Sequence, residues 1–160
     1  MVRRNRARSS SLFLMELIIA ILFFSASSAV CVQFFVKSHL MSNDSNALNH
    51  AVNECAGAAE IIDTADSIED SVNMMKRLYP NGSYPEVQTD MKAADIEIYY
   101  NDSFEACISQ DAAFILTLHM ELNGQMVTAD MQMSSSDSGA NIYELPAKHH
   151  IARRTGYEER

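Results

Sequence analysis

A run of 25 residues, Leu12–Val36, constrains this chain more than any other feature. The run is dominated by apolar residues and holds a single charged one, Glu16. As an α-helix it is about 37 Å long, because each residue adds about 1.5 Å, and the hydrocarbon core of a bilayer is about 30 Å thick. The run therefore predicts one transmembrane helix over residues 12–36.

Charge is divided sharply between the two sides of this run. The leader, residues 1–11, has four arginines and no acid, whereas residues 37–160 hold twenty acidic against eight basic residues, a formal charge of −12. Positive residues beside a membrane helix stay in the cytoplasm. We therefore expect a cytoplasmic N-terminus and an acidic body on the other side. Direct nucleic-acid binding is not expected, because phosphate contacts need clustered Lys and Arg.

Glu16 lies near the start of the predicted membrane helix. A charged side chain at the bilayer centre costs about 2.5–3.5 kcal/mol on insertion scales, and less near a helix end. A carboxylate in such a place needs a partner, so Glu16 is a candidate functional residue. The alternative is a side chain that is protonated or that reaches back to the interface.

The residues around Glu16 resemble the N-terminal signature of type IV prepilins and type II secretion pseudopilins. In that family a basic leader and a Gly precede Phe-Thr-Leu-Ile-Glu-Leu and a long apolar run. The segment after Ser11 aligns with this pattern and matches it at Leu14, Glu16 and Leu17. Two positions depart, because Ser11 replaces the Gly and Leu12 stands where Phe or Met is usual.

The resemblance implies how such a chain would work. A prepilin peptidase would cleave between Ser11 and Leu12, and the new amino group of Leu12 would be N-methylated. A membrane assembly platform would then move the helix into a filament of pilin-like subunits, where Glu16 would pair with a neighbour's N-terminal amine. The implied protein is a structural subunit, a minor pilin or pseudopilin, of a type IV pilus, a type II secretion pseudopilus or a competence pseudopilus. It would start as a single-pass protein of the inner membrane and end in a surface filament.

Helical periodicity continues beyond the apolar run. Apolar residues recur at spacings of three and four residues up to Ile62, which predicts one buried helix face. The expected members of that face are Leu48, Val52, Cys55, Ala59 and Ile62. A break is expected at Asp63–Ser67, where Ser67 followed by Asp70 is typical of a helix start. A second helix with Ile68, Val72, Met75 and Leu78 on one face would stop at Pro80.

The second half of the chain alternates apolar and polar residues, which is typical of half-buried strands. Asn123-Gly124 predicts a tight hairpin turn between two of them. The expected strands are residues 95–100, 113–122, 125–133 and a short 142–145, the last ended by Pro146.

The expected fold is α+β, with a long N-terminal transmembrane and amphipathic helix, a short second helix and a small antiparallel sheet of three to four strands. A long N-terminal helix before an antiparallel sheet is also the layout of the pilin fold. The expected parts are a leader (1–11), a transmembrane helix (12–36), an extracytoplasmic helical segment (37–79), a sheet region (80–147) and a polar tail (148–160).

Two of the three cysteines, Cys55 and Cys107, lie in the part expected outside the cytoplasm, where disulfides persist. A bond between them would close a loop of about fifty residues and contribute roughly 3–4 kcal/mol. The sequence leaves open whether the two meet. Cys31, within the apolar run, is interpreted as a small apolar residue.

The sequence carries no motif for catalysis, a cofactor or a metal. Nucleophile elbows, phosphate loops, zinc-type Cys/His spacings and EF-hand loops are absent. His149-His150 is interpreted as part of a solvated tail, because neighbouring strand residues point to opposite faces, and His119 as an exposed strand residue. We therefore expect a protein that is not an enzyme and uses no cofactor.

Two alternatives stay open. The first is a secreted binding protein whose ordinary signal peptide ends near Ser27-Ser28-Ala29, although Glu16 would then interrupt its apolar region. The second is an uncleaved single-pass membrane-anchored protein, which explains the apolar run but leaves Glu16 without a partner.

Overall fold

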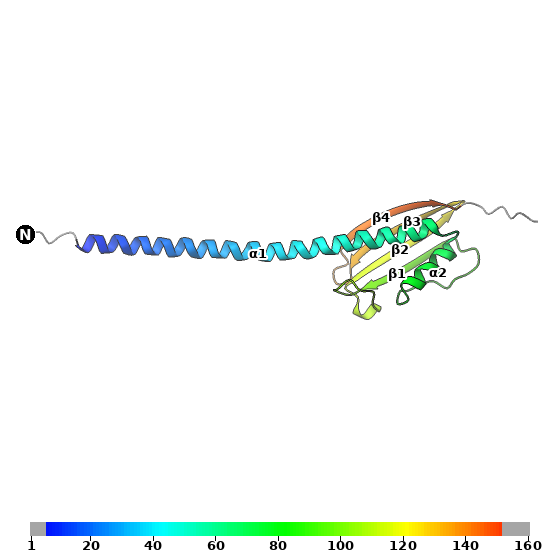
Figure 1. Cartoon of the computed structure of the whole chain (residues 1–160), viewed down its shortest axis with the longest axis horizontal. Helices are drawn as coiled ribbons and strands as arrows, with labels where there is room; N and C mark the ends of the chain where they lie inside the picture. The colour runs from blue at the N-terminus through cyan, green and yellow to red at the C-terminus, as the bar shows by residue number, and fades with distance from the viewer. Residues whose placement is uncertain (1–5, 152–160) are drawn as a thin grey trace, which may run out of the picture. The chain divides into compact units, whose positions relative to one another are not determined.

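The computed structural model describes residues 6–151 (Figure 1). Helices α1 (Arg6–Thr64) and α2 (Ile68–Leu78) come first. They are followed by strand β1 (Ala93–Tyr100), the short 3-10 turn η1 (Ser109–Asp111), and strands β2 (Phe114–Asn123), β3 (Met126–Ser135) and β4 (Asn141–His150). The chain divides into two units between Ser45 and Asn46, although α1 has no break there.

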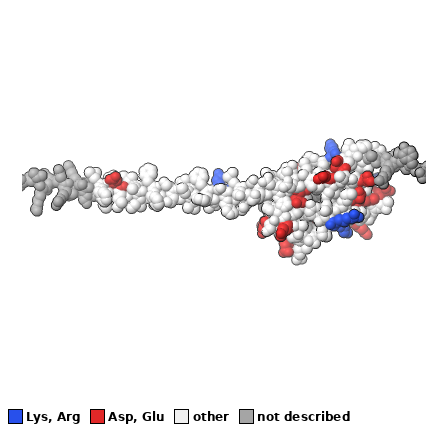
Figure 2. Space-filling model, viewed as in Figure 1, with Lys and Arg blue, Asp and Glu red and all other residues white. Residues whose placement is uncertain are grey.

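The first unit is the N-terminal part of α1. Residues 11–45 are all exposed, and an 18-residue window of the helix reaches a mean hydropathy of 2.2 with none of it buried. By length and composition this helix is able to cross a membrane. Figure 2 shows the segment almost bare of charged side chains, in contrast to the acidic surface of the second unit. No proline interrupts α1, so the helix continues to Thr64.

The second unit has the expected α+β layout. Its strands pair antiparallel in the order β1-β2-β3-β4, so each neighbour in the chain is also a neighbour in the sheet. Ser83 forms an isolated antiparallel bridge with Glu97 on the free side of β1. The sheet thus has one more extended segment than the three to four strands expected. Gly82 is required there, because a Cβ would lie 2.9 Å from the carbonyl oxygen of Glu97.

The core lies between one face of the sheet and the two helices. Alternate residues of β1, β2 and β3 point into it, as the period of two predicts. The buried strand residues are Ala94, Ile96, Ile98, Tyr100, Leu116, Leu118, Met120, Val127, Ala129, Met131 and Met133.

The buried face of α1 differs from the expected one. The residues that pack on the sheet are Ala51, Cys55, Ala58 and Ile62. Leu48 and Val52 are 43% and 36% exposed, so these two predictions were wrong, whereas Ala59 is partly buried and packs against the core as expected. The physical reason is close approach, because alanine lets the helix backbone lie near the strands where a bulky side chain would hold it away.

Helix α2 begins where the sequence predicts. The Oγ of Ser67 accepts a hydrogen bond from the backbone N–H of Asp70, which satisfies a donor of the first turn. Ile68, Val72 and Met75 are buried as expected. Leu78 is 62% exposed, because the helix ends there and its last turn leaves the core.

The predicted hairpin between β2 and β3 forms, but its two-residue loop lies one residue later than the expected Asn123-Gly124. Asn123 pairs with Met126, so the two-residue loop is Gly124-Gln125. Gly124 has a φ of 70°, which a residue with a side chain rarely adopts. A positive φ at the first loop residue alone is typical of a type II′ turn.

Strand β4 is longer than expected. It does not end at Pro146 but runs to His150, so the predicted polar tail cannot begin at residue 148. Pro146 lies opposite Asp130 on the outermost strand. A strand at the edge of a sheet has one side without a neighbour, so a proline whose nitrogen faces outward removes no ladder hydrogen bond.

Candidate functional site

The residues of the predicted processing site lie on one helix. Ser11, Leu12 and Glu16 are all in α1, and all three are exposed. Leu12 and Glu16 are four residues apart and therefore lie on the same side of the helix. Glu16 has no hydrogen-bond or ion-pair partner among residues 11–151, whose side chains the structure describes. Its carboxylate is thus open to a group supplied by another molecule.

The two cysteines considered for a disulfide are free thiols. Cys55 is fully buried on the face of α1 that packs against the sheet, and burial raises its pKa to about 11. Cys107 is half-buried and lies beside the end of β1, where its N–H donates to the carbonyl of Tyr99. The structure does not form the bond that the sequence left open.

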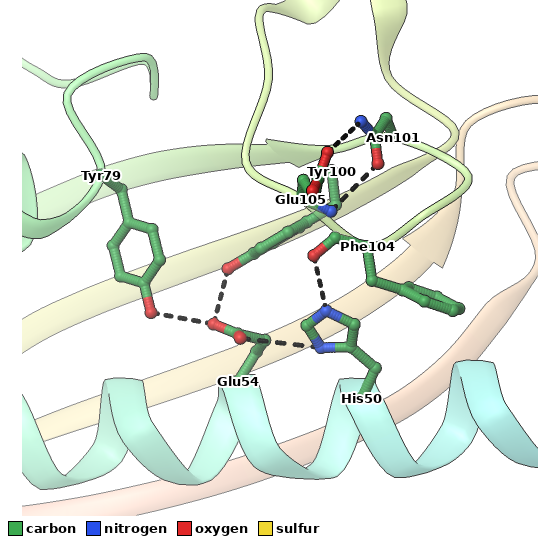
Figure 3. Close-up of polar contacts among 7 residues, drawn as sticks. All are labelled: His50, Glu54, Tyr79, Tyr100, Asn101, Phe104 and Glu105. Atoms are coloured by element: carbon green, nitrogen blue, oxygen red, sulfur yellow. Dashed lines mark hydrogen bonds and ion pairs between the residues drawn. The ribbon is translucent and has the colours of Figure 1, made fainter.

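A half-buried carboxylate, Glu54, connects α1 to two distant parts of the second unit. Its Oε2 accepts hydrogen bonds from the hydroxyls of Tyr79, at 2.8 Å, and Tyr100, at 2.7 Å (Figure 3). Tyr79 is the C-cap residue of α2, and Tyr100 is the last residue of β1. One side chain of α1 therefore holds both the end of the second helix and the end of the first strand.

His50, one turn before Glu54, extends this connection to the loop after β1. Its Nε2 lies 2.8 Å from the carbonyl oxygen of Phe104, and its Nδ1 lies 3.6 Å from Oε1 of Glu54. The ring also packs against those of Tyr100 and Phe104, with centroids 5.4 and 4.6 Å apart. We call these five residues, His50, Glu54, Tyr79, Tyr100 and Phe104, the Glu54 cluster (Figure 3).

The tyrosines of the Glu54 cluster stay protonated at any physiological pH. Burial, followed by the hydrogen bond to Glu54, raises the pKa of Tyr79 to about 12. The same two causes raise the pKa of Tyr100 far above its ordinary value. Both hydroxyls therefore remain donors, and Oε2 of Glu54 always receives two of them.

The loop that His50 holds is shaped by its own hydrogen bonds. The side-chain oxygen of Asn101 accepts from the N–H groups of Ser103, at 2.9 Å, and Glu105, at 3.0 Å. This turn sets Phe104 at a φ of 60°, an uncommon conformation for a bulky side chain. The Phe104 ring stacks on that of Phe114, with centroids 4.8 Å apart.

The sheet face away from the helices carries a second polar group. His119 is exposed there, as expected, and its Nδ1 lies 2.5 Å from a carboxylate oxygen of Asp95. This hydrogen bond raises the pKa of His119. A shallow hollow of about 310 Å³ surrounds the pair, with Asp130 and Glu144 among its lining residues. Within residues 6–151, no three His, Cys, Asp or Glu side chains are placed to hold a metal ion.

His149 and His150 do not lie in a solvated tail. Both belong to β4, and Nδ1 of His149 lies 2.8 Å from a carboxylate oxygen of Asp63 in the last turn of α1. His149 faces the helices because it alternates inward with Leu145 and Ala147.

Sequence analysis missed the Glu54 cluster. The spacing of His50 and Glu54, one helical turn, was a visible signal of a pair. Their other partners lie 25 to 54 residues away, and no local pattern reveals contacts of that separation. The cluster is internally satisfied and presents no open nucleophile, whereas the Glu16 carboxylate meets no partner in the part of the chain whose side chains are described. Searches against family models, curated proteins and solved structures find no match for this chain.

Proposed function

We propose that this chain is a pilin-like structural subunit, a minor pilin or pseudopilin, assembled through the first part of α1 after cleavage between Ser11 and Leu12. One observation carries the proposal. Residues 12–36 form an exposed apolar helix with a single charged residue, Glu16, and the same helix continues into an α+β body. Acidic residues 44, 54, 60 and 63 all follow Lys37.

The exposed helix needs something to cover it. Soluble monomers rarely leave contiguous apolar surfaces of more than a few hundred Å² uncovered. A bilayer supplies such a cover before assembly, and the helices of neighbouring subunits supply it afterwards. The run Ser25-Ala26-Ser27-Ser28-Ala29 suits the second role, because small residues let helix backbones approach closely in apolar surroundings.

Glu16 gives the proposed assembly its register. A new amino group at Leu12 would be about 6 Å along the helix axis from Glu16, since four residues rise by about 1.5 Å each. In an apolar surrounding a carboxylate is stable when a cation neutralises it, and an N-terminal amine is the cation that cleavage creates. A neighbouring subunit shifted along the helix axis would place its N-terminal amine against Glu16. This pair would fix the axial position of each subunit relative to the next.

The first test determines the mature N-terminus by mass spectrometry of the protein from its native host. The expected chain begins at an N-methylated Leu12. A chain that begins at Val30 would lack Glu16 and would favour a secreted binding protein. An intact leader would contradict processing of the native chain. Cleavage of Ser11→Gly would then identify a pilin-like chain whose Ser11 blocks the peptidase, and an uncleaved variant would indicate a plain membrane-anchored protein.

The second test measures assembly. Glu16→Gln removes the charge and keeps the shape of the side chain, so we expect at least a tenfold loss of cross-linked subunits in sheared or membrane fractions. Glu60→Gln, an exposed carboxylate in the second unit, is the matched control and should assemble normally. Equal assembly of the two variants would remove Glu16 from the mechanism.

A further inference from the structure

Asparagine followed by glycine occurs twice in the chain, at Asn81-Gly82 and at Asn123-Gly124. The backbone nitrogen of such a glycine can attack Cγ of the asparagine side chain, because glycine has no Cβ to obstruct the approach. A bond forms between the nitrogen and Cγ, the bond from Cγ to Nδ2 breaks, and the amide leaves as ammonia with the proton of the backbone nitrogen. Water then opens the resulting succinimide ring at either carbonyl, which gives aspartate or isoaspartate.

The two glycines occupy different positions in their turns. A four-residue turn is closed by a hydrogen bond from the N–H of its fourth residue to the carbonyl of its first. Gly82 is the fourth residue of the turn that begins at Tyr79, and its N–H donates to the Tyr79 carbonyl at 3.1 Å. Gly124 is the second residue of the hairpin turn that begins at Asn123 and ends at Met126. Its N–H accordingly has no hydrogen-bond acceptor within the part of the chain that the structure describes.

The surroundings of the two glycines add to this difference. A Cβ on Gly82 would lie 2.9 Å from the carbonyl oxygen of Glu97, and the next residue, Ser83, exchanges two backbone hydrogen bonds with Glu97. The first pair is thus held between a closed turn and an extended segment. Around Gly124 nothing lies within 4 Å of the position of an added Cβ, and both Asn123 and Gly124 are exposed.

The geometry points to a site of covalent modification, which we propose: Asn123 cyclises onto the nitrogen of Gly124 and deamidates, whereas the fold protects Asn81. The reaction needs a backbone N–H that is free to lose its proton and a peptide plane that has room to turn. The tip of the hairpin provides both. The side-chain amide of Asn123 has no hydrogen bond to any described residue, so none of them holds it away from the nitrogen. Water is the only co-reactant.

The isoaspartate product changes the hairpin more than aspartate does. Both products add one negative charge, but isoaspartate also adds a methylene group to the backbone between residues 123 and 124. Asn123 pairs with Met126, and the carbonyl of Gln125 accepts from the N–H of Ile151, directly after β4. A longer backbone at the turn therefore weakens the pairing at the tip of β2 and β3 and the contact that holds the end of β4.

Peptide mass spectrometry of the full chain, kept folded in detergent in a mildly alkaline buffer, tests the proposal. Samples taken over time are compared for the mass gain of an amide-to-acid conversion in peptides that cover residue 81 or residue 123. We expect Asn123 to deamidate about tenfold faster than Asn81, since a hydrogen bond of ordinary strength restrains the Gly82 nitrogen. Equal rates, or a faster reaction at Asn81, would overturn the proposal.

The same chain in guanidinium chloride is the control for sequence. Unfolding removes both turns, so the two pairs should then react at similar rates. A preference for Asn123 that persists after unfolding would show that the neighbouring residues, and not the fold, select the site.

Two variants identify the residue and its product. Asn123→Gln keeps the amide but must close a larger ring, so the mass gain near residue 123 should disappear while that at Asn81 stays. A gain that survives would belong to Gln125 and would reject the assignment. Asn123→Asp carries the added charge without the longer backbone. Hydrogen–deuterium exchange at residues 122–126 and 149–151 should be faster in the aged wild-type chain than in this variant, and equal exchange would contradict the effect of isoaspartate on the hairpin.

Discussion

Helix α1 is one continuous helix with two different surfaces. Over residues 12–36 its apolar side chains surround the helix on every side, and each of residues 11–45 is exposed. After residue 46 a single stripe is buried, made of Ala51, Cys55, Ala58 and Ile62. The first surface is typical of a helix that lies in an apolar medium or a bundle, and the second of a helix on a sheet. The change from bulky to small side chains therefore marks where the helix gains its own protein partner.

The two surfaces also treat polar groups differently. Glu16, in the first part, has no hydrogen-bond or ion-pair partner among residues 11–151, whereas Glu54, in the second, accepts two hydroxyls. A carboxylate in an apolar medium is stable when it is paired. The body satisfies Glu54 internally, whereas the proposed membrane or filament setting of Glu16 requires a partner from another molecule. This contrast gives four predictions.

The largest expected difference is between two cysteines of the same helix. Cys31 is exposed in the first unit and Cys55 is fully buried in the second. Cys55 must wait for the body to open, and the high pKa of its thiol lowers the thiolate fraction further. We expect N-ethylmaleimide to modify Cys55 roughly a thousandfold more slowly than Cys31, since opening a stable domain costs several kcal/mol.

Peptide mass spectrometry of the labelled chain in detergent measures both rates. Cys107, exposed in part, provides the reference in the second unit and should react at a rate nearer to that of Cys31. Modification of both Cys55 and Cys107 only after reduction would reveal a disulfide and contradict the free thiols.

The next comparison removes the same atoms in both parts. Ile62→Ala takes a buried side chain from the contact between α1 and the sheet, and should lower the free energy of unfolding by about 2–5 kcal/mol. Ile18→Ala makes the same change at an exposed position of the first unit. Urea unfolding of the body, followed by circular dichroism in detergent, should leave the midpoint of Ile18→Ala unchanged. Equal losses would mean that the first part also packs on the body.

The strands could be predicted from the sequence because their signal is local. Alternation in residues 114–122 and 126–133 fixes which side chains face the core without knowledge of the neighbouring strand. The break between α1 and α2 was equally visible, because Ser67 caps α2 through Asp70, only three residues away. Glu16 was found for the same reason, because one charge in an apolar run stands out by itself.

Features that depend on distant contacts could not be predicted. Hydrophobicity ranks Leu48 above Ala51, yet Ala51 is buried, because the distance between helix and sheet selects small residues. Pro146 predicts a strand end unless the strand is known to be the outermost one. Tyr79 and Tyr100 meet Glu54 through the packing of three elements, which no local pattern encodes.

The third prediction sharpens the contrast between the two carboxylates. Tyr100→Phe removes one hydroxyl from Glu54 inside the body and should cost about 1.5–3 kcal/mol, the range for a hydrogen bond to a charged group. Tyr99→Phe removes a hydroxyl that bonds the exposed Glu97, where water replaces it, and should change little. The measurement is again urea unfolding. A loss for Tyr100→Phe no larger than that for Tyr99→Phe would show that Glu54 does not hold β1 to α1.

The smallest effect concerns how α2 begins where α1 ends. The Oγ of Ser67 accepts from the N–H of Asp70, so Ser67→Ala leaves that donor without its partner and should cost about 1 kcal/mol. Ser67→Gly also lacks the hydroxyl, but glycine lets water reach the first turn, and the expected loss is a few tenths of a kcal/mol. Thermal unfolding of the two variants shows which of them is the less stable. If Ser67→Gly were the less stable variant, the backbone freedom of glycine at residue 67 would matter more than the cap. The turn between the helices, and not the hydrogen bond of Ser67, would then set the start of α2.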